Sequence, residues 1–333
     1  MGELRGRSLA AWLIVCFVWG STYLAIRVGV GALPPFLMAG VRFLVAGVLL
    51  AAFARLRGEK LPAGRREWAD LALAGVLLLC VGNGLVVWAE QYVDSGSASI
   101  YVVTGALWSA GFDAAIPGGT TRFSLRLAAG FILGLLGSAV LVGVTPHQLL
   151  AADLRAPVSL ILASASWALG SVYLKRRHIS AGFTTAATVQ MLAGGVALLA
   201  VALLRGEQHL WHSSPGGLAA LAYLIVAGSL VGFTAYGYAL RHASATVVGT
   251  FAYVNPVVAV LLGWVILGEP LSPRKIAAMV VILGAVLWIQ SAVRTDARRE
   301  LRAGGARPAG AERRWRREVI PWADRRRGDL VSP

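Results

Sequence analysis

The chain has few charged residues for its length. Asp, Glu, Lys and Arg together make up 14% of its 333 residues, whereas a soluble globular domain usually contains about 25%. Hydrophobic residues make up 57% of the chain, and the mean hydropathy is +0.69. This composition excludes a soluble globular domain and predicts a polytopic membrane protein.

The chain also lacks the motifs of metalloenzymes and of nucleotide-driven pumps. It has only two cysteines, Cys16 and Cys80, and both fall inside apolar stretches, so we predict neither a disulfide nor a metal site of spaced Cys and His residues. No H-E-x-x-H, C-x-x-C or G-x-x-x-x-G-K-[ST] motif occurs. We therefore expect no metal, no cofactor, no catalytic residue and no direct use of ATP.

Ten apolar windows are long enough to cross a membrane. A spanning helix needs about 20 apolar residues, and backbone groups in lipid must find their hydrogen-bond partners within the same segment. These windows therefore predict an all-α protein with ten transmembrane helices. They cover residues 9–30, 34–54, 67–88, 95–116, 124–143, 156–176, 183–204, 217–239, 244–267 and 272–292.

The loops predict how these helices are oriented. Connections on the same side as the N-terminus carry eleven Lys and Arg residues, and connections on the other side carry five. Positive loops face the cytoplasm, so both termini are predicted to be cytoplasmic. The net charge of +15 then reports topology, and we expect no binding of nucleic acid.

The last segment, residues 294–333, mixes arginine with glycine, alanine and proline. This composition is typical of a disordered or partly helical cytoplasmic tail. Trp315 and Trp322 lie among arginines in the tail and would suit contact with anionic lipid headgroups.

The chain contains an internal repeat. Gly20-Ser21-Thr22-Tyr23-Leu24 returns as Gly170-Ser171-Val172-Tyr173-Leu174, and a tryptophan precedes each copy. We predict a first five-helix unit at 9–143 and a second at 156–292. Because five is odd, the second unit enters the bilayer from the opposite side, and inverted repeats of this kind enclose a central cavity in many secondary transporters.

Arg42 is the one Lys or Arg that lies deep inside a predicted span. An unpaired arginine at this depth costs about 3 kcal/mol on insertion scales, so it should face a polar interior or a partner acid. The partner could be a substrate carboxylate, or the arginine could have a structural partner, either a cluster of carbonyl groups or an acid such as Glu90 or Asp113. The second unit has Gln190 at the equivalent position.

Aromatic, hydroxyl and amide side chains gather near the predicted midplane of the membrane. Such a set suits a cavity for an amphiphilic small molecule, although many of these rings could instead only pack helices together. Pro256, inside the ninth window, removes a helical hydrogen bond and predicts a kink. The candidate substrate-binding residues are Trp19, Ser21, Thr22, Tyr23, Arg42, Asn83, Tyr101, Trp108, Trp167, Ser171, Tyr173, Tyr236, Tyr253 and Asn255.

Several of these motifs resemble a known group of proteins. They are Trp19-Gly20-Ser21-Thr22-Tyr23, Pro34-Pro35 with Arg42-Phe43, Gly82-Asn83-Gly84, Trp167 with Gly170-Ser171-Val172-Tyr173, Ala252-Tyr253-Val254-Asn255-Pro256 and Gly268-Glu269. Together they resemble the drug/metabolite transporter superfamily with two EamA domains, especially its YedA-type inner-membrane exporters. The resemblance implies ten helices, a multi-pass protein of the bacterial inner membrane, and export of small metabolites without ATP. It lapses between residues 104 and 123.

We therefore interpret the chain as a secondary transporter that exports amino acids or amphiphilic drugs by alternating access. Two other classes stay open at this point, a membrane-embedded enzyme acting on a lipid-linked substrate and a non-transporting sensor or assembly protein. Gly130-x-x-x-Gly134 predicts a helix-packing face within or between protomers, which leaves a homodimer open.

Overall fold

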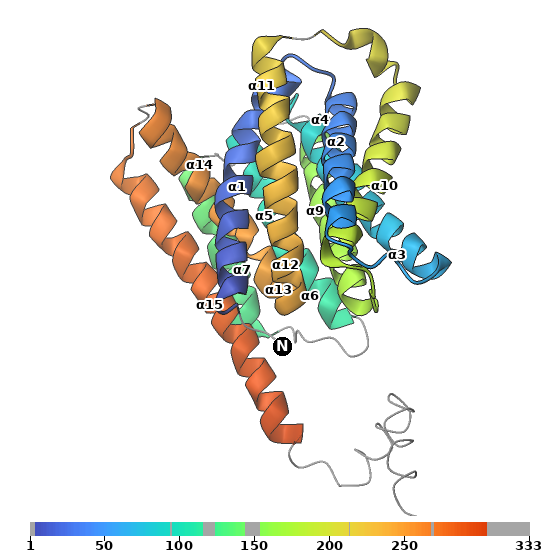
Figure 1. Ribbon diagram of the computed structural model, residues 1–333. Coiled ribbons are helices and arrows are strands. Elements are labelled where there is room, and N and C mark those ends of the chain that lie inside the picture. The colour runs from blue at the N-terminus through green and yellow to red at the C-terminus, as the bar shows by residue number, and fades with distance from the viewer. Residues whose placement is uncertain are drawn as a thin grey trace, which may run out of the picture.

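The structure is a computed structural model that describes residues 4–93, 95–115, 124–143, 154–212, 214–267 and 270–304. Every regular element within these ranges is a helix, and the longest ones run side by side in one bundle (Figure 1). The N-terminus and the C-terminal end of the last helix lie at the same end of the bundle (Figure 1).

Eight helices are long and apolar enough to cross a membrane among the described residues. Of the two other predicted spans, the fifth is α7 (Leu125–Val142), and its apolar part is shorter. The fourth is divided at Thr104 into α5 (Ser95–Val103) and α6 (Gly105–Ala115). The eight are α1 (Arg7–Val30), α2 (Pro35–Leu56), α3–η1–α4 (Arg65–Ala89), α9 (Arg155–Arg176), α10 (Phe183–Leu204), α11–η3–α12 (Pro215–His242), α13 (Ala245–Gly249) with α14 (Phe251–Leu267), and α15 (Pro273–Gly304).

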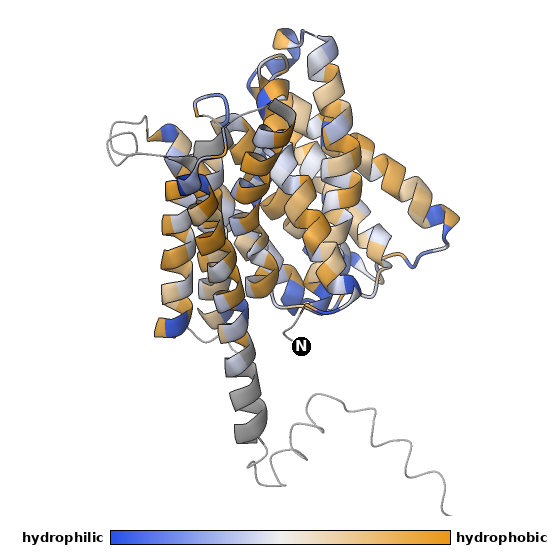
Figure 2. Cartoon of the chain, turned by 90° about the vertical axis from the view of Figure 1, so that its left-hand side faces the viewer, coloured by the Kyte–Doolittle hydropathy of each residue, from blue (hydrophilic) through white to orange (hydrophobic). Residues whose placement is uncertain are grey.

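Apolar side chains cover the outward faces of these helices. In the view of Figure 2, hydrophobic residues form a band along the middle of the helices, and hydrophilic residues gather toward the two ends. Large side chains such as Phe17, Val48, Val265 and Leu287 are exposed within this band. In water such a surface would be unfavourable, so the band matches the hydrocarbon layer of a membrane.

Corresponding spans in the two halves are interrupted in the same way. The third and eighth predicted spans each contain a π-helical segment, η1 (Val76–Asn83) and η3 (Leu224–Phe233). The fourth and ninth spans break at Thr104 and Thr250, and each threonine hydroxyl donates to the carbonyl three residues earlier at 2.7 Å. π-Helical segments are rare and often mark functional sites.

Small residues bring α2 and α10 together along their length. Leu199 packs against Gly40, Gly195 against Leu44, and Leu192 against Gly47. Since the residue number on α10 falls as the number on α2 rises, the two helices are antiparallel. Each glycine removes a side chain where a leucine of the other helix needs the space.

The helices α7 and α15 also pack antiparallel through glycines. Gly130 contacts Ile289, and Gly137 contacts Ile282. Gly134 faces the Tyr253 ring of α14. The Gly130-x-x-x-Gly134 pattern is therefore used for packing inside the chain. The helix α15 extends beyond residue 294 to Gly304, whereas Trp315, Trp322 and Glu269 lie outside the described residues.

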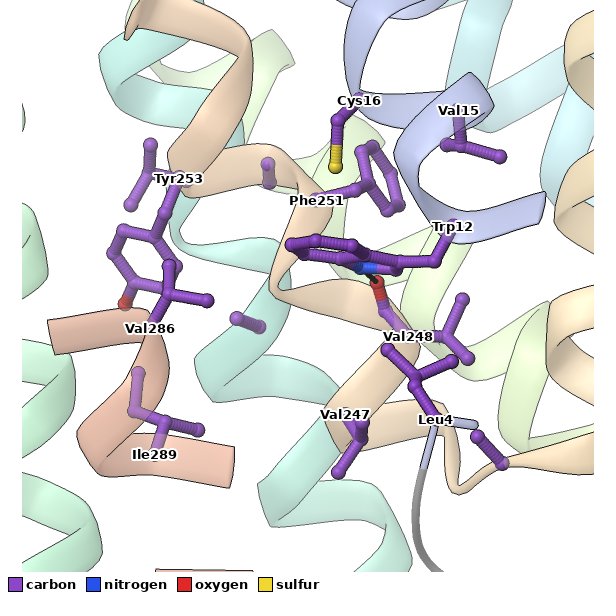
Figure 3. Close-up of a cluster of buried hydrophobic side chains, with 14 of the residues drawn as sticks. Leu4, Trp12, Val15, Cys16, Val247, Val248, Phe251, Tyr253, Val286 and Ile289 are labelled. Atoms are coloured by element: carbon purple, nitrogen blue, oxygen red, sulfur yellow. Dashed lines mark hydrogen bonds between the residues drawn. The ribbon is translucent and has the colours of Figure 1, made fainter. Parts of the chain in front are cut away.

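A buried cluster at the N-terminal end joins the start of α1 to the second half. The Trp12 ring lies among Leu4, Val248 and Phe251, and its Nε1 donates to the Val248 carbonyl oxygen at 3.2 Å (Figure 3). Tyr253 points to the opposite side of α14, toward Val286 of α15 (Figure 3). This cluster places α13 on the N-terminal side of the bundle.

The α2–α10 pair is also tied at each end by a glutamate. Each half contains Leu-Arg-Gly-Glu after its second helix, at 56–59 and 204–207. Glu59 accepts hydrogen bonds from the backbone N–H groups of Thr184 and Thr185 at the start of α10. Glu207 accepts one from the backbone N–H of Leu37 at the start of α2. Each half therefore caps the helix of the other half, and anions are favoured at these positions.

We expect Glu59→Gln to destabilise the protein by about 1 kcal/mol and Glu207→Gln to have almost no effect. Glu59 receives four hydrogen bonds from Thr184 and Thr185, and a glutamine has only one acceptor oxygen. Partial burial acts to raise the pKa of Glu59, but these bonds outweigh it and hold the pKa below its usual value. Burial raises the pKa of Glu207, so a neutral side chain is tolerated there.

Thermal unfolding of the two variants in detergent measures this difference. The contribution of Glu59 should be fully present above the unfolded-state pKa of about 4.3 and should disappear as pH falls through the lower folded-state pKa. Equal destabilisation by both substitutions at neutral pH would contradict the assignment.

Candidate functional site

A cavity of about 90 Å³ lies between the two halves. Its wall comes from α1, α2, η1, α5, α6, α9, η3, α12 and α14 together with adjoining residues. Eight of the predicted site residues line it, namely Trp19, Thr22, Tyr23, Arg42, Asn83, Trp167, Tyr236 and Asn255. The structure thus brings residues that are up to 236 positions apart in the chain to one space, which we call the central cavity.

Two tryptophans from equivalent positions meet in the middle of the cavity wall. The ring centroids of Trp19 and Trp167 are 5.1 Å apart, and the rings are perpendicular. A methyl group added at Gly232 would stand 2.4 Å from Trp19 Nε1, and one at Gly82 would stand 3.1 Å from the Trp167 ring. Each tryptophan therefore occupies space left by a glycine of the other half.

Hydrogen bonds fix the orientation of both rings. Trp19 Nε1 donates to the carbonyl oxygen of Gly228 at 3.0 Å. Trp167 Nε1 donates to the Tyr236 hydroxyl at 3.0 Å, and Ser171 Oγ lies 2.5 Å from the same hydroxyl. Because these polar groups are satisfied, the ring faces are left to form an apolar surface.

Arg42 supplies the positive charge of the central cavity. Its side chain is buried, with 4% exposure. Nε donates to Ser229 Oγ at 2.8 Å, and the guanidinium lies over the Phe43 ring at 4.7 Å. Nη1 has no hydrogen-bond partner in the described parts of the chain. Buried charges are usually paired, so the binding of an anion would stabilise this guanidinium.

Neither acid considered from the sequence forms an ion pair with Arg42. Asp113 is bound to Arg176 at 2.7 Å. The Glu90 carboxylate is fully buried, and no carboxylate of the described residues lies within 4.0 Å of the Arg42 guanidinium. Among the described residues, therefore, neither Glu90 nor Asp113 forms the structural ion pair with Arg42.

Asn83 provides a complementary acceptor. It is the last residue of η1, it lines the central cavity, and its Oδ1 is buried without a hydrogen-bond partner among the described residues. The π-helical turn places Gly82 beneath Trp167 and Asn83 beside it, toward the cavity. The central cavity thus contains a buried donor without a partner, Arg42 Nη1, and a buried acceptor without a partner, Asn83 Oδ1, among the described residues. A ligand that offers an acceptor to the first and a donor to the second would satisfy both.

Asn255 and Pro256 tie α14 to α1. With its amide oriented to satisfy both atoms, Asn255 donates to the carbonyl oxygens of Phe251 at 3.1 Å and Cys16 at 3.2 Å. Pro256 lies inside α14, and the interruption of this span comes earlier, at Thr250. The freed polar groups predicted around the proline are therefore used in part to join two helices.

Three predicted residues on α1, α5 and α6 lie outside the central cavity. Ser21 Oγ donates to the Val18 carbonyl and lies 2.6 Å from the Tyr223 hydroxyl. Trp108 is 37% exposed, and Tyr101 is half-buried but does not line the cavity. For Ser21 the reason is helical geometry, since Trp19, Thr22 and Tyr23 form the inward face and Ser21 falls beside it.

Three predicted residues of the second half also lie outside the central cavity. Tyr253 packs on Gly134, and its hydroxyl donates to the Phe131 carbonyl at 3.3 Å. Tyr173 donates to Asp70 at 2.6 Å. Ser171 stands behind Tyr236 and positions its hydroxyl. On α14 the inward face is occupied by Ala252 and Asn255, three residues apart, which turns Tyr253 away.

Other residues of the cavity were missed in the sequence. Phe233 and Phe251 line the wall, with Phe251 5.0 Å from the Trp19 ring centroid. Ser229 holds Arg42, and Gly228 leaves room for it, since a methyl group there would stand 2.6 Å from Nη2. A small Gly-Ser pair inside a continuous apolar span was the available signal.

The fold and cavity define an all-helical membrane protein built from two similar halves. Residues 6–143 and 154–291 each match the EamA-like transporter family. The chain belongs to this family.

Its relatives are membrane transporters. The chain is 41% identical over 273 residues to "Uncharacterized inner membrane transporter YedA" of Escherichia coli, which covers 82% of this chain and 87% of that protein. It is 28% identical to "Probable terminal-alkyne amino-acid exporter" of Streptantibioticus cattleyicolor, over 85% of this chain and 93% of that one. A crystal structure that is 21% identical has a TM-score of 0.69 over 87% of this chain and 99% of its own, which shows the fold.

Proposed function

We propose that this protein is a secondary transporter of the inner membrane that exports small amphiphilic amino acids or related metabolites by alternating access. The observation that carries the proposal is the unpaired Arg42 guanidinium in an aromatic-walled cavity. Arg42 would bind the carboxylate of the cargo, Asn83 Oδ1 would accept a hydrogen bond from its ammonium group, and Trp19 and Trp167 would contact its apolar side chain.

The proposed arrangement of the halves is an inverted repeat of ten spans, with both termini in the cytoplasm. The antiparallel packing of α2 on α10 and of α7 on α15 supports it, because these pairs occupy equivalent places in the two family matches. Charge-rich loops on the N-terminal side support the orientation.

The glutamate caps at both ends favour a fixed α2–α10 pair during transport. Glu59 and Glu207 each link the two halves, one at each end of this pair. Access would then alternate through movement of the surrounding helices. The third and eighth spans would bend at their π-helical segments, η1 and η3, during this movement. If transport is coupled to protons, Glu90 is the candidate acid, although it does not line the central cavity.

Counterflow in proteoliposomes tests this function. We expect exchange of a labelled apolar amino acid such as phenylalanine across vesicles that contain the protein. Unlabelled phenylalanine should compete, whereas phenethylamine, which lacks the carboxylate, should compete about 10- to 100-fold less well because a charge-assisted hydrogen bond contributes about 1.5–3 kcal/mol. 3-Phenylpropionate, which lacks only the ammonium group, should lie between them.

A panel of other apolar amino acids and cationic amphiphiles extends the same assay. Equal competition by phenethylamine and phenylalanine would refute carboxylate recognition. Absence of exchange for the whole panel, with correctly inserted protein, would refute export.

A further inference from the structure

A second cavity, of about 580 Å³, lies next to the central one. Its wall includes Lys175, Arg177, His178 and Arg241. It lies on the N-terminal side, because the end of α12 that carries Arg241 is followed by Ala243, which packs in the same buried cluster as Leu4. We call this cavity the vestibule.

Positive charge in the vestibule exceeds the negative charge that faces it. Asp70 lies 3.6 Å from Arg177 and accepts a hydrogen bond from Tyr173. Asp113 is bound to Arg176, and Glu59 is occupied at the start of α10. Each of these acids is therefore already engaged.

Two cations of the vestibule have no carboxylate within 4.0 Å among the residues that the structure describes. Lys175 Nζ donates one hydrogen bond, to the Leu240 carbonyl oxygen at 2.5 Å, and an ammonium group has three donors. Arg241 is exposed and lies over the Phe183 ring at 4.9 Å, which leaves its planar N–H donors available.

The wall between the two cavities is aromatic. Phe233 and Tyr236 line both cavities. Tyr236 is 3% exposed and is held by Trp167 and Ser171. A molecule that passes between the cavities must displace the Tyr236 ring and break these hydrogen bonds. Arg42 lines the central cavity, Lys175 and Arg241 line the vestibule, and these two aromatic residues are shared by both walls.

We propose that the vestibule is a second binding site for small amphiphilic anions, placed in series with the central cavity. Lys175 and Arg241 bind the anionic group, and Phe183 with Phe233 contacts the apolar part. Cargo binds in the vestibule first. It reaches Arg42 when the Tyr236 ring moves aside. This inference rests on the proposed function, since it assigns the route by which a carboxylate-bearing cargo reaches the central cavity.

Equilibrium binding of dansylglycine, a fluorescent amphiphilic carboxylate, to the full chain in nanodiscs tests the proposal. The wild-type protein should bind two molecules per chain. The double substitution Lys175→Gln and Arg241→Gln should weaken one class at least tenfold, and Arg42→Gln should remove the other. Raising the salt from 0.1 to 1 M should weaken the vestibule class more, because it is open to water and the screening length falls from about 10 to 3 Å.

Two further variants separate charge from fold. Arg241→Lys should retain the vestibule class, and Arg55→Gln, which removes an exposed charge at the same end of the bundle without lining either cavity, should retain both. A single class that is lost in Arg42→Gln and unchanged in the double variant would refute the vestibule site and leave the proposed function standing. Failure of the wild-type chain to bind dansylglycine at all would also refute the vestibule site, whereas the proposed function is tested separately by the counterflow of phenylalanine.

Discussion

Arg42→Gln is expected to abolish high-affinity binding of an apolar amino acid and, at the same time, to raise the unfolding temperature of the protein. The guanidinium is buried and has one unsatisfied N–H group. Burying such a charge without an anion costs several kcal/mol, so a neutral side chain should stabilise the empty protein by about 1 kcal/mol or more. Without the charge, cargo affinity should fall about 10- to 100-fold.

Glutamine is a suitable replacement because the other half already contains one at the equivalent place. Gln190 is buried and donates to the Ala186 carbonyl four residues earlier, at 3.0 Å. A glutamine at position 42 could bond to Met38 in the same way. The expected gain in stability is thus not offset by a newly unsatisfied amide.

Thermal unfolding and equilibrium binding on the same preparation measure the two effects. Arg42→Lys keeps a positive charge without the planar fork and should retain part of the affinity. Arg55→Gln removes an exposed charge and should change neither quantity. A variant at Arg42 that unfolds at lower temperature and binds cargo normally would show that the arginine is structural.

Gly75→Ala should prevent stable folding. At the end of α3, a Cβ at this position would stand 2.2 Å from the carbonyl oxygen of Gln190 and 2.7 Å from its Cα. These are backbone atoms of α10, so no side-chain rotation can relieve the overlap. Overpacking that forces a backbone shift costs roughly 3 kcal/mol or more, which exceeds the helix-propensity gain of about 1 kcal/mol for alanine.

The matched control is Gly284→Ala, a glycine inside α15 with nothing within 4 Å of the new methyl group. This variant should be neutral or slightly stabilised. Expression, size-exclusion profile and unfolding temperature in detergent report both outcomes. If Gly75→Ala behaved like Gly284→Ala, the close crossing of α3 and α10 would be wrong.

The sequence predicted the helical spans better than the details inside them. Hydrophobic length alone located the eight helices that the structure shows able to cross a membrane. The π-helical segments and the breaks at Thr104 and Thr250 were not predicted. Within η3, Gly232 leaves room for the Trp19 ring of the other half, and such a contact between distant residues is not visible in local sequence.

For the candidate site, the sequence indicated which residues share one face of a helix, but it did not indicate which faces of different helices meet. The face of α1 that carries Trp19, Thr22 and Tyr23 lines the central cavity. Tyr253 and Trp108 were also aromatic and near the midplane, yet they face away from the cavity, because the rotation of each helix is set by its neighbours.

By itself, the sequence determined that this chain is a duplicated helical membrane protein, because span length, loop charge and repeated motifs are local properties of the chain. Only the tertiary structure decided that Arg42 has no acid partner in the described part of the chain and that Glu59 and Glu207 cap the opposite halves. It also placed Tyr236 in the walls of both cavities. These features depend on contacts between residues far apart in the chain, and such contacts exist only after the helices have packed.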